Sequence, residues 1–423
     1  MNRVINAELM WLHSNGEIEL VVRPVGETRG RAWPATARFA SGGLPVRIVS
    51  SAVRETVIYR FPTTLTMTSN GARLGEVYAI LAGESKEGFT GARLNFRDII
   101  ALGRQKRVFL YVVPTDQVTS NPKWQGYVRL GTRRWMSVPC PPPQAVYNRI
   151  PNRLLERRPS AVQARQLLAN QNIPLFNPEY FSKSKIYEML IEGGMADFLP
   201  DTVSQLTQAD LYAMLYKHMA VYLKPSGGSV GHGMLRIEAN KGKWAVFVLK
   251  HGRTTQFICE SLEDVWQTVC RQRVPGKYVI QQAIRTLEYR GQSCDFRVLL
   301  QKRSGAWEMV GRGVRVSGAG TITTHVPNGG SIADANVVLA GAFGAEALRV
   351  GRNLEQAVVR AAVLIDQRYG GNLGEMSMDI GIDERGQPWF FEANAKPMKF
   401  DEPDIRKKSL EGVLQQLHER AFK

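Results

Sequence analysis

The feature that most constrains how this chain can fold is a pair of apolar segments that surround a turn between residues 374 and 397. The segment reads GEMSMDIGIDERGQPWFFEANAKP, with the tetrad ERGQ at its centre. Apolar runs on both sides of a glycine-containing turn are typical of a β-hairpin. Counting outward from the middle of the tetrad places Asp379 opposite Glu392, with Asn394 further along the same face. The sequence therefore predicts two carboxylates and one amide on one face of a hairpin.

Carboxylates that face each other across two strands repel one another, and the apolar residues around this pair strengthen the repulsion. A cation between them would remove it. Mg²⁺ takes hard oxygen ligands from one or two carboxylates and completes its shell with substrate phosphates. We therefore predict that Asp379, Glu392 and Asn394 bind Mg²⁺. The alternative is an acidic face in contact with solvent.

A second segment, AVYLKPSGGSVGHGMLRIE, reads as a strand, a glycine-rich loop and a second strand. Backbone N–H groups of such a loop can converge on one phosphate, because glycine brings no Cβ atom into the way. Lys224 lies at the entrance of the loop, before the glycines, whereas the lysine of a P-loop follows them. The loop residues that we assign to phosphate binding are Ser226, Gly227, Gly228 and Gly231. A flexible hairpin loop with an exposed lysine is the alternative.

Two further segments, SCDFRVLLQ and GRGVRVSG, alternate as β-strands do. In the first, Asp295 and Arg297 fall on the face opposite Phe296, and in the second Gly313 and Arg315 share one face. Arginines beside an acidic metal site suit the transfer of a phosphoryl group, because the guanidinium stays charged and can bind phosphate with two hydrogen bonds. Ordinary surface arginines are the alternative for each of them.

The overall charge is strongly positive, with 55 Lys and Arg residues against 38 Asp and Glu residues and a formal net charge of +17. This charge is compatible with nucleotides, nucleic acids or acidic polymers as partners. The basic residues are scattered, and the sequence has no interleaved basic and aromatic stretch of the kind that binds RNA. We therefore do not expect nucleic acid to be the partner.

Cysteine usage and hydropathy bear on the location of the protein. The four cysteines form no CxxC pair, which argues against a zinc knuckle or a redox motif and favours a reducing compartment. The N-terminus lacks the apolar core of a signal peptide, and no run of about 18 apolar residues could span a bilayer. We therefore expect a cytoplasmic protein without a membrane partner.

The chain divides into three parts by pattern. Residues 1–68 are rich in alternating, β-branched stretches and read as β-structure. In residues 69–159 the segments EVYAIL, NFRDIIALGRQK and VFLYVVP have the order of a βαβ unit with buried parallel strands. Helical spacing returns at residue 160 after a proline-rich stretch, so we place the last domain over residues 160–423.

The order of the chemical motifs in that last part resembles that of ATP-grasp enzymes: a lysine beside a glycine-rich hairpin, the apolar segment YVIQQAI, a DxR strand, and a hairpin with Asp and ExN. Within that superfamily, AVYNRIPNR, FSKSKIYEML, RVSGAG followed by VPNGG, and GEMSMDIGID are similar to the YheC/YheD-like ATP-grasp proteins of spore-forming bacteria. The resemblance implies a mixed α+β and α/β fold. In it, two α+β subdomains sandwich ATP behind a small βαβ domain and a β-rich N-terminal segment.

The resemblance also implies roles for residues by position. Lys224 would contact the phosphates, and Lys183, with Lys185 as a nearby rival, would match the lysine that opens the first helix of the fold. Gln282 and Ile284 would hold adenine at the hinge, where many members of the superfamily have glutamate instead of glutamine.

Nearer to the reaction, Asp379, Glu392 and Asn394 would match the metal ligands. Arg297 and Arg315 would match the catalytic arginines near the γ-phosphate and the substrate, and Asn328 would line the acceptor side.

The chemistry implied by the resemblance is Mg²⁺-dependent transfer of the γ-phosphoryl group of ATP to a carboxylate, followed by attack of an amine or a thiol on the acylphosphate and release of ADP and phosphate. The expected partners are a small-molecule or peptide carboxylate and an amine acceptor, with a link to sporulation or the spore coat. Two alternatives stay open: a non-catalytic spore-associated protein that keeps this fold, and a basic nucleic-acid-binding protein.

Overall fold

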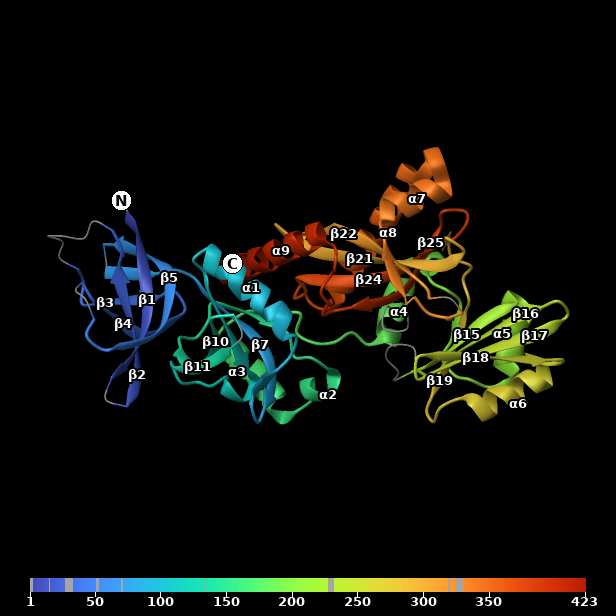
Figure 1. Ribbon diagram of the computed structural model, residues 1–423, viewed down its shortest axis with the longest axis horizontal. Helices are drawn as coiled ribbons and strands as arrows, with labels where there is room; N and C mark the ends of the chain where they lie inside the picture. Colours follow the sequence, from blue (N-terminus) through green and yellow to red (C-terminus); the bar gives the residue numbers. More distant parts are fainter. Residues whose placement is uncertain are drawn as a thin grey trace.

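The computed structural model of the chain describes residues 3–14, 16–26, 33–50, 53–69, 71–132, 134–226, 232–318, 320–324 and 330–423. Four β-sheets follow one another along the long axis of the molecule (Figure 1). The N-terminal barrel lies at one end, and the third sheet along the chain lies at the other end, beyond the fourth. The C-terminal helix returns to the middle of the molecule.

The N-terminal part is a closed barrel with the strand order β1-β2-β4-β3-β6-β5. Alternation along its strands buries Leu9, Trp11 and Phe61 in the interior, while Glu8 and Arg60 meet outside in an ion pair of 3.0 Å. The N-terminal part is therefore β-structure, as its pattern predicts, and its barrel continues to Leu74, beyond the predicted end at residue 68. Its strands are β1 (Arg3–Ser14), β2 (Glu17–Pro24), β3 (Thr36–Phe39), β4 (Gly42–Ile48), β5 (Thr56–Thr68) and β6 (Gly71–Leu74).

The second sheet contains the predicted βαβ unit. Strands β7 and β9 are parallel neighbours that start in register at Val77 and Phe109, and α1 connects them. Both strands are buried over nearly their whole length, as strands with helices on their faces are. The elements are β7 (Val77–Ser85), β8 (Gly88–Thr90), α1 (Arg93–Gln105), β9 (Phe109–Pro114), β10 (Trp124–Leu130), β11 (Arg134–Cys140), β12 (Ala145–Asn148), α2 (Arg153–Glu156), α3 (Pro159–Asn170) and β13 (Leu175–Phe176).

The third sheet is antiparallel, with the order β14-β19-β15-β16-β17-β18. Helices α5 and α6 pack on one of its faces and bury the core there, and the side chains of Tyr222 and Lys224 lie on the other face. The elements are β14 (Thr202–Val203), α5 (Gln208–His218), β15 (Ala220–Pro225), β16 (Met234–Asn240), β17 (Lys243–Lys250), β18 (Arg253–Cys259), α6 (Leu262–Gln272) and β19 (Tyr278–Gln282).

The fourth sheet has the order β23-β22-β21-β24-β25, and β20 pairs with the start of β21. Helices α4 and α8 pack on one face, over the large apolar core, and α9 contacts β21 and β22. The elements are α4 (Lys183–Glu192), β20 (Glu288–Tyr289), β21 (Gln292–Arg303), β22 (Ala306–Val316), β23 (Ser331–Ala333), α7 (Ala335–Phe343), α8 (Ala347–Arg368), β24 (Glu375–Ile382), β25 (Pro388–Asn394) and α9 (Pro403–Ala421).

Buried polar contacts join the second and the fourth sheets. The ammonium of Lys396, just after β25, forms an ion pair with Glu156 of α2, and both side chains are almost fully buried. Nη1 of Arg149 lies 3.7 Å from Oε1 of Glu375 of β24, and these two side chains are also almost fully buried. These pairs hold the end of β25 in place, and with it the predicted metal ligands.

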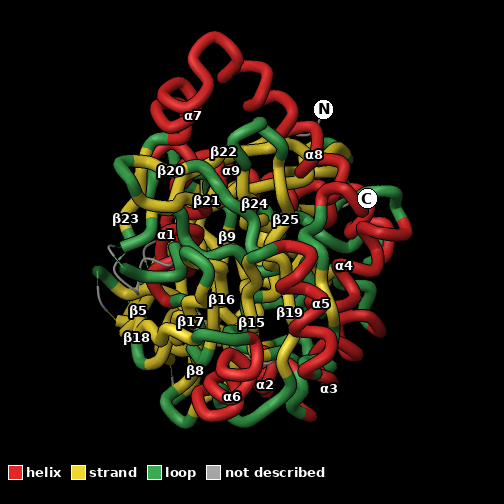
Figure 2. Tube along the Cα trace, turned by 90° about the vertical axis from the view of Figure 1, so that its right-hand side faces the viewer, coloured by secondary structure: helices red, strands yellow, loops and turns green. Residues whose placement is uncertain are grey.

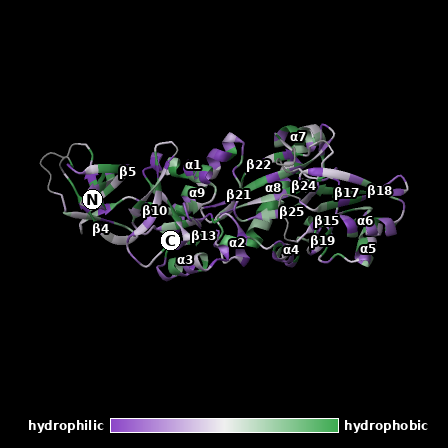
Figure 3. Cartoon of the chain, turned by 60° about the horizontal axis from the view of Figure 1, so that its bottom comes forward, coloured by the Kyte–Doolittle hydropathy of each residue, from purple (hydrophilic) through white to green (hydrophobic). Residues whose placement is uncertain are grey.

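Helix α7 lies on the outside of the molecule although its sequence is apolar. It consists almost wholly of apolar residues (Figure 3) and projects from the body beside α8 (Figure 2). It is only nine residues long. In the part of the chain that the structure describes, no helix is both long and apolar enough to cross a membrane.

Candidate active site

The acidic hairpin forms as the sequence predicts. Strands β24 and β25 are antiparallel, Asp379 lies opposite Glu392, and Asn394 lies opposite Ser377. The intervening residues Met378 and Ile380 point into the apolar core and are fully buried. The two carboxylates and the amide therefore share the face of the sheet that is turned away from that core.

The loop of the hairpin differs from the prediction. It runs from Asp383 to Gln387, and the Asp383 carboxylate accepts hydrogen bonds of 2.9 Å from the N–H groups of Arg385 and Gln387. The longer loop shifts the pairing next to it by one residue, so that Ile382 lies opposite Pro388. A β-bulge between Asp379 and Ile380 shifts the pairing back. The predicted partner of Asp379 is thus correct only because the bulge compensates for the loop.

Arg315 of β22 bridges two carboxylates of this face. It donates two hydrogen bonds of 2.8 Å to Asp295 of β21 and lies 2.9 Å from Oδ2 of Asp379. Burial raises the pKa of the Asp295 carboxyl, and the guanidinium opposes that rise. Burial by itself would lower the pKa of Arg315, but Asp379 and Asp295 outweigh it and raise that pKa. The sequence predicted Arg315 near a phosphate, and the structure places it against the acidic residues.

The side-chain oxygen atoms on this face are suitable ligands for a hard cation. Oδ1 of Asp379 and Oγ of Ser377 are buried and have no hydrogen-bond partner within the described ranges. Glu392 and Asn394, on the neighbouring strand, are half-buried. No cluster of three or more His, Cys, Asp or Glu side chains suited to a metal occurs among the residues that the structure describes. A metal here would therefore use two carboxylates, one amide and oxygens from a ligand, as Mg²⁺ does beside phosphates.

Two lysines face the acidic hairpin from other elements. Lys183 is the first residue of α4, and its Nζ lies 3.4 Å from Oε2 of Glu392. The ammonium of Lys224 lies 5.9 Å from the ring centroid of Phe391 on β25, although Lys224 belongs to the third sheet. Burial lowers the pKa of Lys224 to about 8, and the nearby charge of Lys183 adds to this effect. The third and fourth sheets thus bring two cations against the acidic face.

The sequence of residues 172–421 matches the family of YheC/D-like ATP-grasp domains. The chain belongs to the YheC/D-like ATP-grasp family. Two relatives are from Bacillus subtilis (strain 168). Endospore coat-associated protein YheD is 29% identical over 329 residues, which are 75% of this chain and 71% of the relative. Endospore coat-associated protein YheC is 22% identical over 202 residues, 47% of this chain and 55% of the relative.

Among solved structures, the D-alanine-D-alanine ligase from Coxiella burnetii is similar at 12% identity with a TM-score of 0.45, over 82% of this chain and 97% of that one. The predicted family and fold class of this ATP-grasp chain are confirmed by the family match. Its two α+β units are the third and fourth sheets with their helices, and the acidic hairpin belongs to the second of these units.

The segment YVIQQAI, predicted to hold adenine, contains a further polar residue that the sequence motifs did not single out. Gln281 accepts a hydrogen bond from Lys224 and donates to the Tyr187 hydroxyl at 2.7 Å. The predicted hinge residue Gln282 instead accepts a hydrogen bond from the N–H of Asp201 at 3.2 Å, and Ile284 lies half-buried just after β19. Alternation along YVIQQAI puts Gln281 and Gln282 on opposite faces, and the register of β15 against β19 places Gln281 on the face of Lys224.

Several predicted phosphate contacts fall outside the described residues, namely Gly227, Gly228, Gly231 and Asn328. Ser226 is described, and its backbone N–H donates to the carbonyl of Lys277 at 2.9 Å. This hydrogen bond extends the pairing between β15 and β19. The N–H of Ser226, which was predicted to point at a phosphate, is therefore already bound to a backbone carbonyl.

Arg297 lies next to the acidic face but points past it. It is paired in register with Asp379, yet its guanidinium stacks 5.5 Å from the ring centroid of Phe400, and its Nε is buried without a partner in the described structure. Arg297, Lys399 and Glu402 line a cavity of about 60 Å³. A Cβ atom at Gly313 would come within 1.9 Å of the Glu402 carboxylate, so the Glu402 side chain would have to move to admit a larger residue there. The cavity thus places Arg297 and Lys399 beside the acidic hairpin, together with the carboxylates of Asp401 and Glu402.

Proposed function

We propose that this protein is an ATP- and Mg²⁺-dependent ligase that joins a carboxylate to an amine or a thiol through an acylphosphate and releases ADP and phosphate. The observation that carries this proposal is the buried Oδ1 of Asp379, opposite Glu392, which has no hydrogen-bond partner in the described part of the chain. Lys224, from the other sheet, faces the same hairpin. Anionic metal ligands on one side and a lysine on the other suit a nucleotide phosphate chain with its cation.

The metal site in this proposal consists of Asp379, Glu392 and Asn394. Mg²⁺ bound there would offset the negative charge that develops on the phosphate oxygens. Lys183 would exchange its contact with Glu392 for a phosphate oxygen when the nucleotide enters. This exchange is easy, because the lysine side chain is 53% exposed and such exposed ion pairs contribute little stability.

The half-buried Lys224 would contribute an electrostatic contact to the phosphates. In the free protein, burial disfavours its charged form. A phosphate oxygen next to it would stabilise that form, as Gln281 already does by accepting its hydrogen bond. Phosphate binding would therefore favour protonation of Lys224.

Arg297 would hold the substrate carboxylate. Its Nε has no hydrogen-bond partner among the residues that the structure describes, and a guanidinium can donate two parallel hydrogen bonds to a carboxylate. The carboxylate oxygen would form a bond to the γ-phosphorus while the bond from that phosphorus to the bridging oxygen of ADP breaks. The amine would then attack the acyl carbon, lose a proton and displace phosphate. Arg315 would act indirectly, by holding the Asp379 carboxylate in place.

The biological setting is proposed from the relatives. Both are named as endospore coat-associated proteins. We extend the association with the spore coat to the present chain. In this proposal it is a cytoplasmic enzyme, and either the enzyme itself or its product becomes part of the spore coat. Detection of the protein in coat extracts of spores, but not in washed spore cores, tests this assignment.

One observation favours a second candidate, a binding protein without turnover. Arg315 already neutralises part of the charge on Asp379 and Asp295 within the fold. An internal cation of this kind stabilises the acidic face without a metal ion. In that case the protein would keep the ATP-grasp fold and bind nucleotide without transferring phosphate.

A screen for ADP release separates the two candidates. The purified protein is incubated with MgATP and pairs of carboxylates and amines, and hydroxylamine is added to trap an acylphosphate as hydroxamate. We expect ADP and hydroxamate with a competent carboxylate, and neither with the Asp379→Asn variant. A melting shift with MgATP but no ADP from any pair would favour the binding protein. AMP as the nucleotide product would contradict the proposed mechanism.

A further inference from the structure

The outer edge of the third sheet is a strand without the usual protection against pairing. Strand β18 is the last strand of the sheet, and it pairs with β17 in unbroken register from Trp244 and Cys259 to Lys250 and Arg253. After Arg253 it reads TTQFIC, without charge, proline or bulge. Edge strands are normally blunted by these features or kept very short. The opposite edge of the same sheet is short, since β14 has only two residues.

The edge is also accessible. Thr255 and Gln256 are exposed, and Ile258 is 53% exposed although it is apolar. Threonine, phenylalanine and isoleucine favour extended backbone, which helps β18 to keep its strand geometry although it pairs with β17 on one side only. An exposed edge of this composition can accept a further strand through its main-chain N–H and C=O groups.

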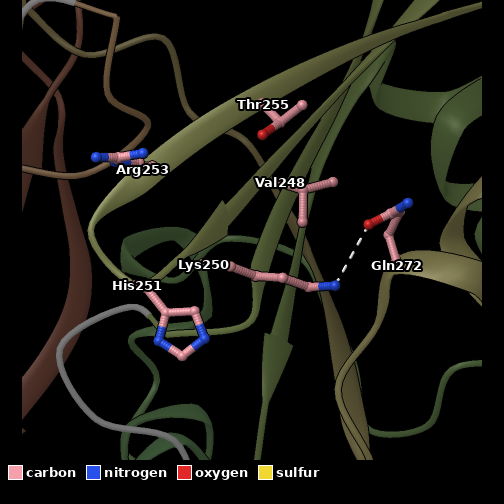
Figure 4. A pocket seen from close by; sticks show the side chains of 6 residues that line it. All are labelled: Val248, Lys250, His251, Arg253, Thr255 and Gln272. Atoms are coloured by element: carbon pink, nitrogen blue, oxygen red, sulfur yellow. Dashed lines mark hydrogen bonds between the residues drawn. The ribbon is translucent and has the colours of Figure 1, made fainter.

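A basic pocket adjoins the start of this edge (Figure 4). Its volume is about 540 Å³, and it is lined by Val248, Lys250, His251, Arg253, Thr255 and Gln272. Figure 4 shows the Lys250 side chain extended toward Gln272 of α6, to which it donates a hydrogen bond of 3.3 Å. Within the described ranges, no carboxylate lies within ion-pair distance of Lys250 or Arg253. The charges of this pocket are therefore available to an anion.

The pocket is separate from the candidate active site. Register places Val248 beside Leu235 and Leu223, whose side chains belong to the helix-covered core of the sheet. Lys224 alternates with Leu223 and points to the opposite face. A molecule in the basic pocket thus lies on the other side of the sheet from the proposed nucleotide site.

We propose that β18 binds an acidic peptide segment in extended conformation, as an additional strand of the third sheet. In such a strand every second side chain lies on the pocket face, about 5 Å from Arg253 and Thr255. Glutamate or aspartate at those positions would face the guanidinium of Arg253, and Lys250, one strand further in, adds positive charge on the same face. Main-chain hydrogen bonds to β18 supply affinity, and the two cations select acidic residues. This docking needs no nucleotide and does not depend on the proposed ligase activity.

Fluorescence anisotropy tests the proposal with a labelled peptide of alternating Val and Glu, as long as the seven residues of β18, at low salt. The full-length protein is used. We expect saturable binding that the Lys250→Glu, Arg253→Glu double variant weakens by about tenfold or more, because a close charge pair is lost and a repulsive one is gained. The matched control is Lys241→Glu, Lys243→Glu, an equal change of charge at the other end of β17, which should leave binding unchanged. Melting curves establish that both variants are folded.

Two further measurements separate strand addition from simple anion binding. A peptide with the same charge, in which proline replaces valine, cannot form the ladder and should not bind. Hydrogen exchange should show that amides of residues 253–259 become protected when the alternating peptide binds. Equal binding of the proline peptide, or unchanged exchange of β18, would show an anion pocket only and overturn the proposal. Absence of any binding would also overturn it.

Discussion

Replacement of Arg315 by methionine should destabilise the protein by about 3–5 kcal/mol, because it leaves two buried carboxylates without their shared counter-charge. Arg315 donates two hydrogen bonds of 2.8 Å to Asp295 and lies 2.9 Å from Asp379. All three side chains are no more than a tenth exposed, so water does not replace the lost contacts. Methionine fills most of the volume of the arginine stem, so the main loss is electrostatic.

Urea unfolding at neutral pH measures the effect as a lower midpoint with an unchanged slope. Neutralising one carboxylate should undo part of it, so the double variant Arg315→Met, Asp295→Asn should recover about half of the loss or more. Mg²⁺ should also stabilise Arg315→Met more than the parent, because the metal then has no competing internal cation.

The matched control is Arg312→Met, the same substitution on the same strand. Arg312 donates hydrogen bonds only to neutral groups in the described structure, at 3.2 Å to the carbonyl of Gly351 and at 3.1 Å to Asn336. Its loss should cost about 1 kcal/mol. The reasoning is refuted if Arg315→Met is as stable as Arg312→Met, or if Asp295→Asn fails to improve it.

Three other predictions follow from the geometry. Asp379→Asn should abolish Mg²⁺-dependent turnover in a folded protein, whereas Glu384→Gln in the exposed hairpin loop should not; unfolding of the first variant would contradict the metal site. Because the pKa of Lys224 is lowered to about 8, nucleotide affinity should fall as the pH rises through that value, and binding near it should take up protons, which calorimetry in two buffers would detect. Lys396→Met should destabilise the protein by about 3–5 kcal/mol, since Glu156 stays buried without its partner, and an unchanged melting temperature would contradict this.

The sequence by itself determined the features that depend on neighbours in the chain. Asp379 and Glu392 lie on adjacent strands of one hairpin, so alternation and a turn signal were enough to pair them. The βαβ unit at β7, α1 and β9 was predictable for the same reason, because one connection sets the order of its strands. The motif order then identified the family, which the match over residues 172–421 confirms.

Details inside those elements were not determined locally. The bulge beside Asp379 has no turn residue or proline to mark it, and it restores the pairing that the longer loop displaces. Likewise, alternation shows that Gln281 and Gln282 face opposite sides, but only the position of Lys224 on the next strand shows which side faces the hairpin.

Tertiary structure alone decided the contacts between segments far apart in the chain. Arg315 meets Asp379 only because β21 lies between β22 and β24, which the sequence of no single strand specifies. Lys396 meets Glu156, and Lys224 meets the hairpin, across sheets that are distant in sequence. Hydropathy fixes which face of a strand is buried, since burial depends on each side chain separately. Which charges then meet depends on the packing of whole sheets, and therefore on all of their residues together.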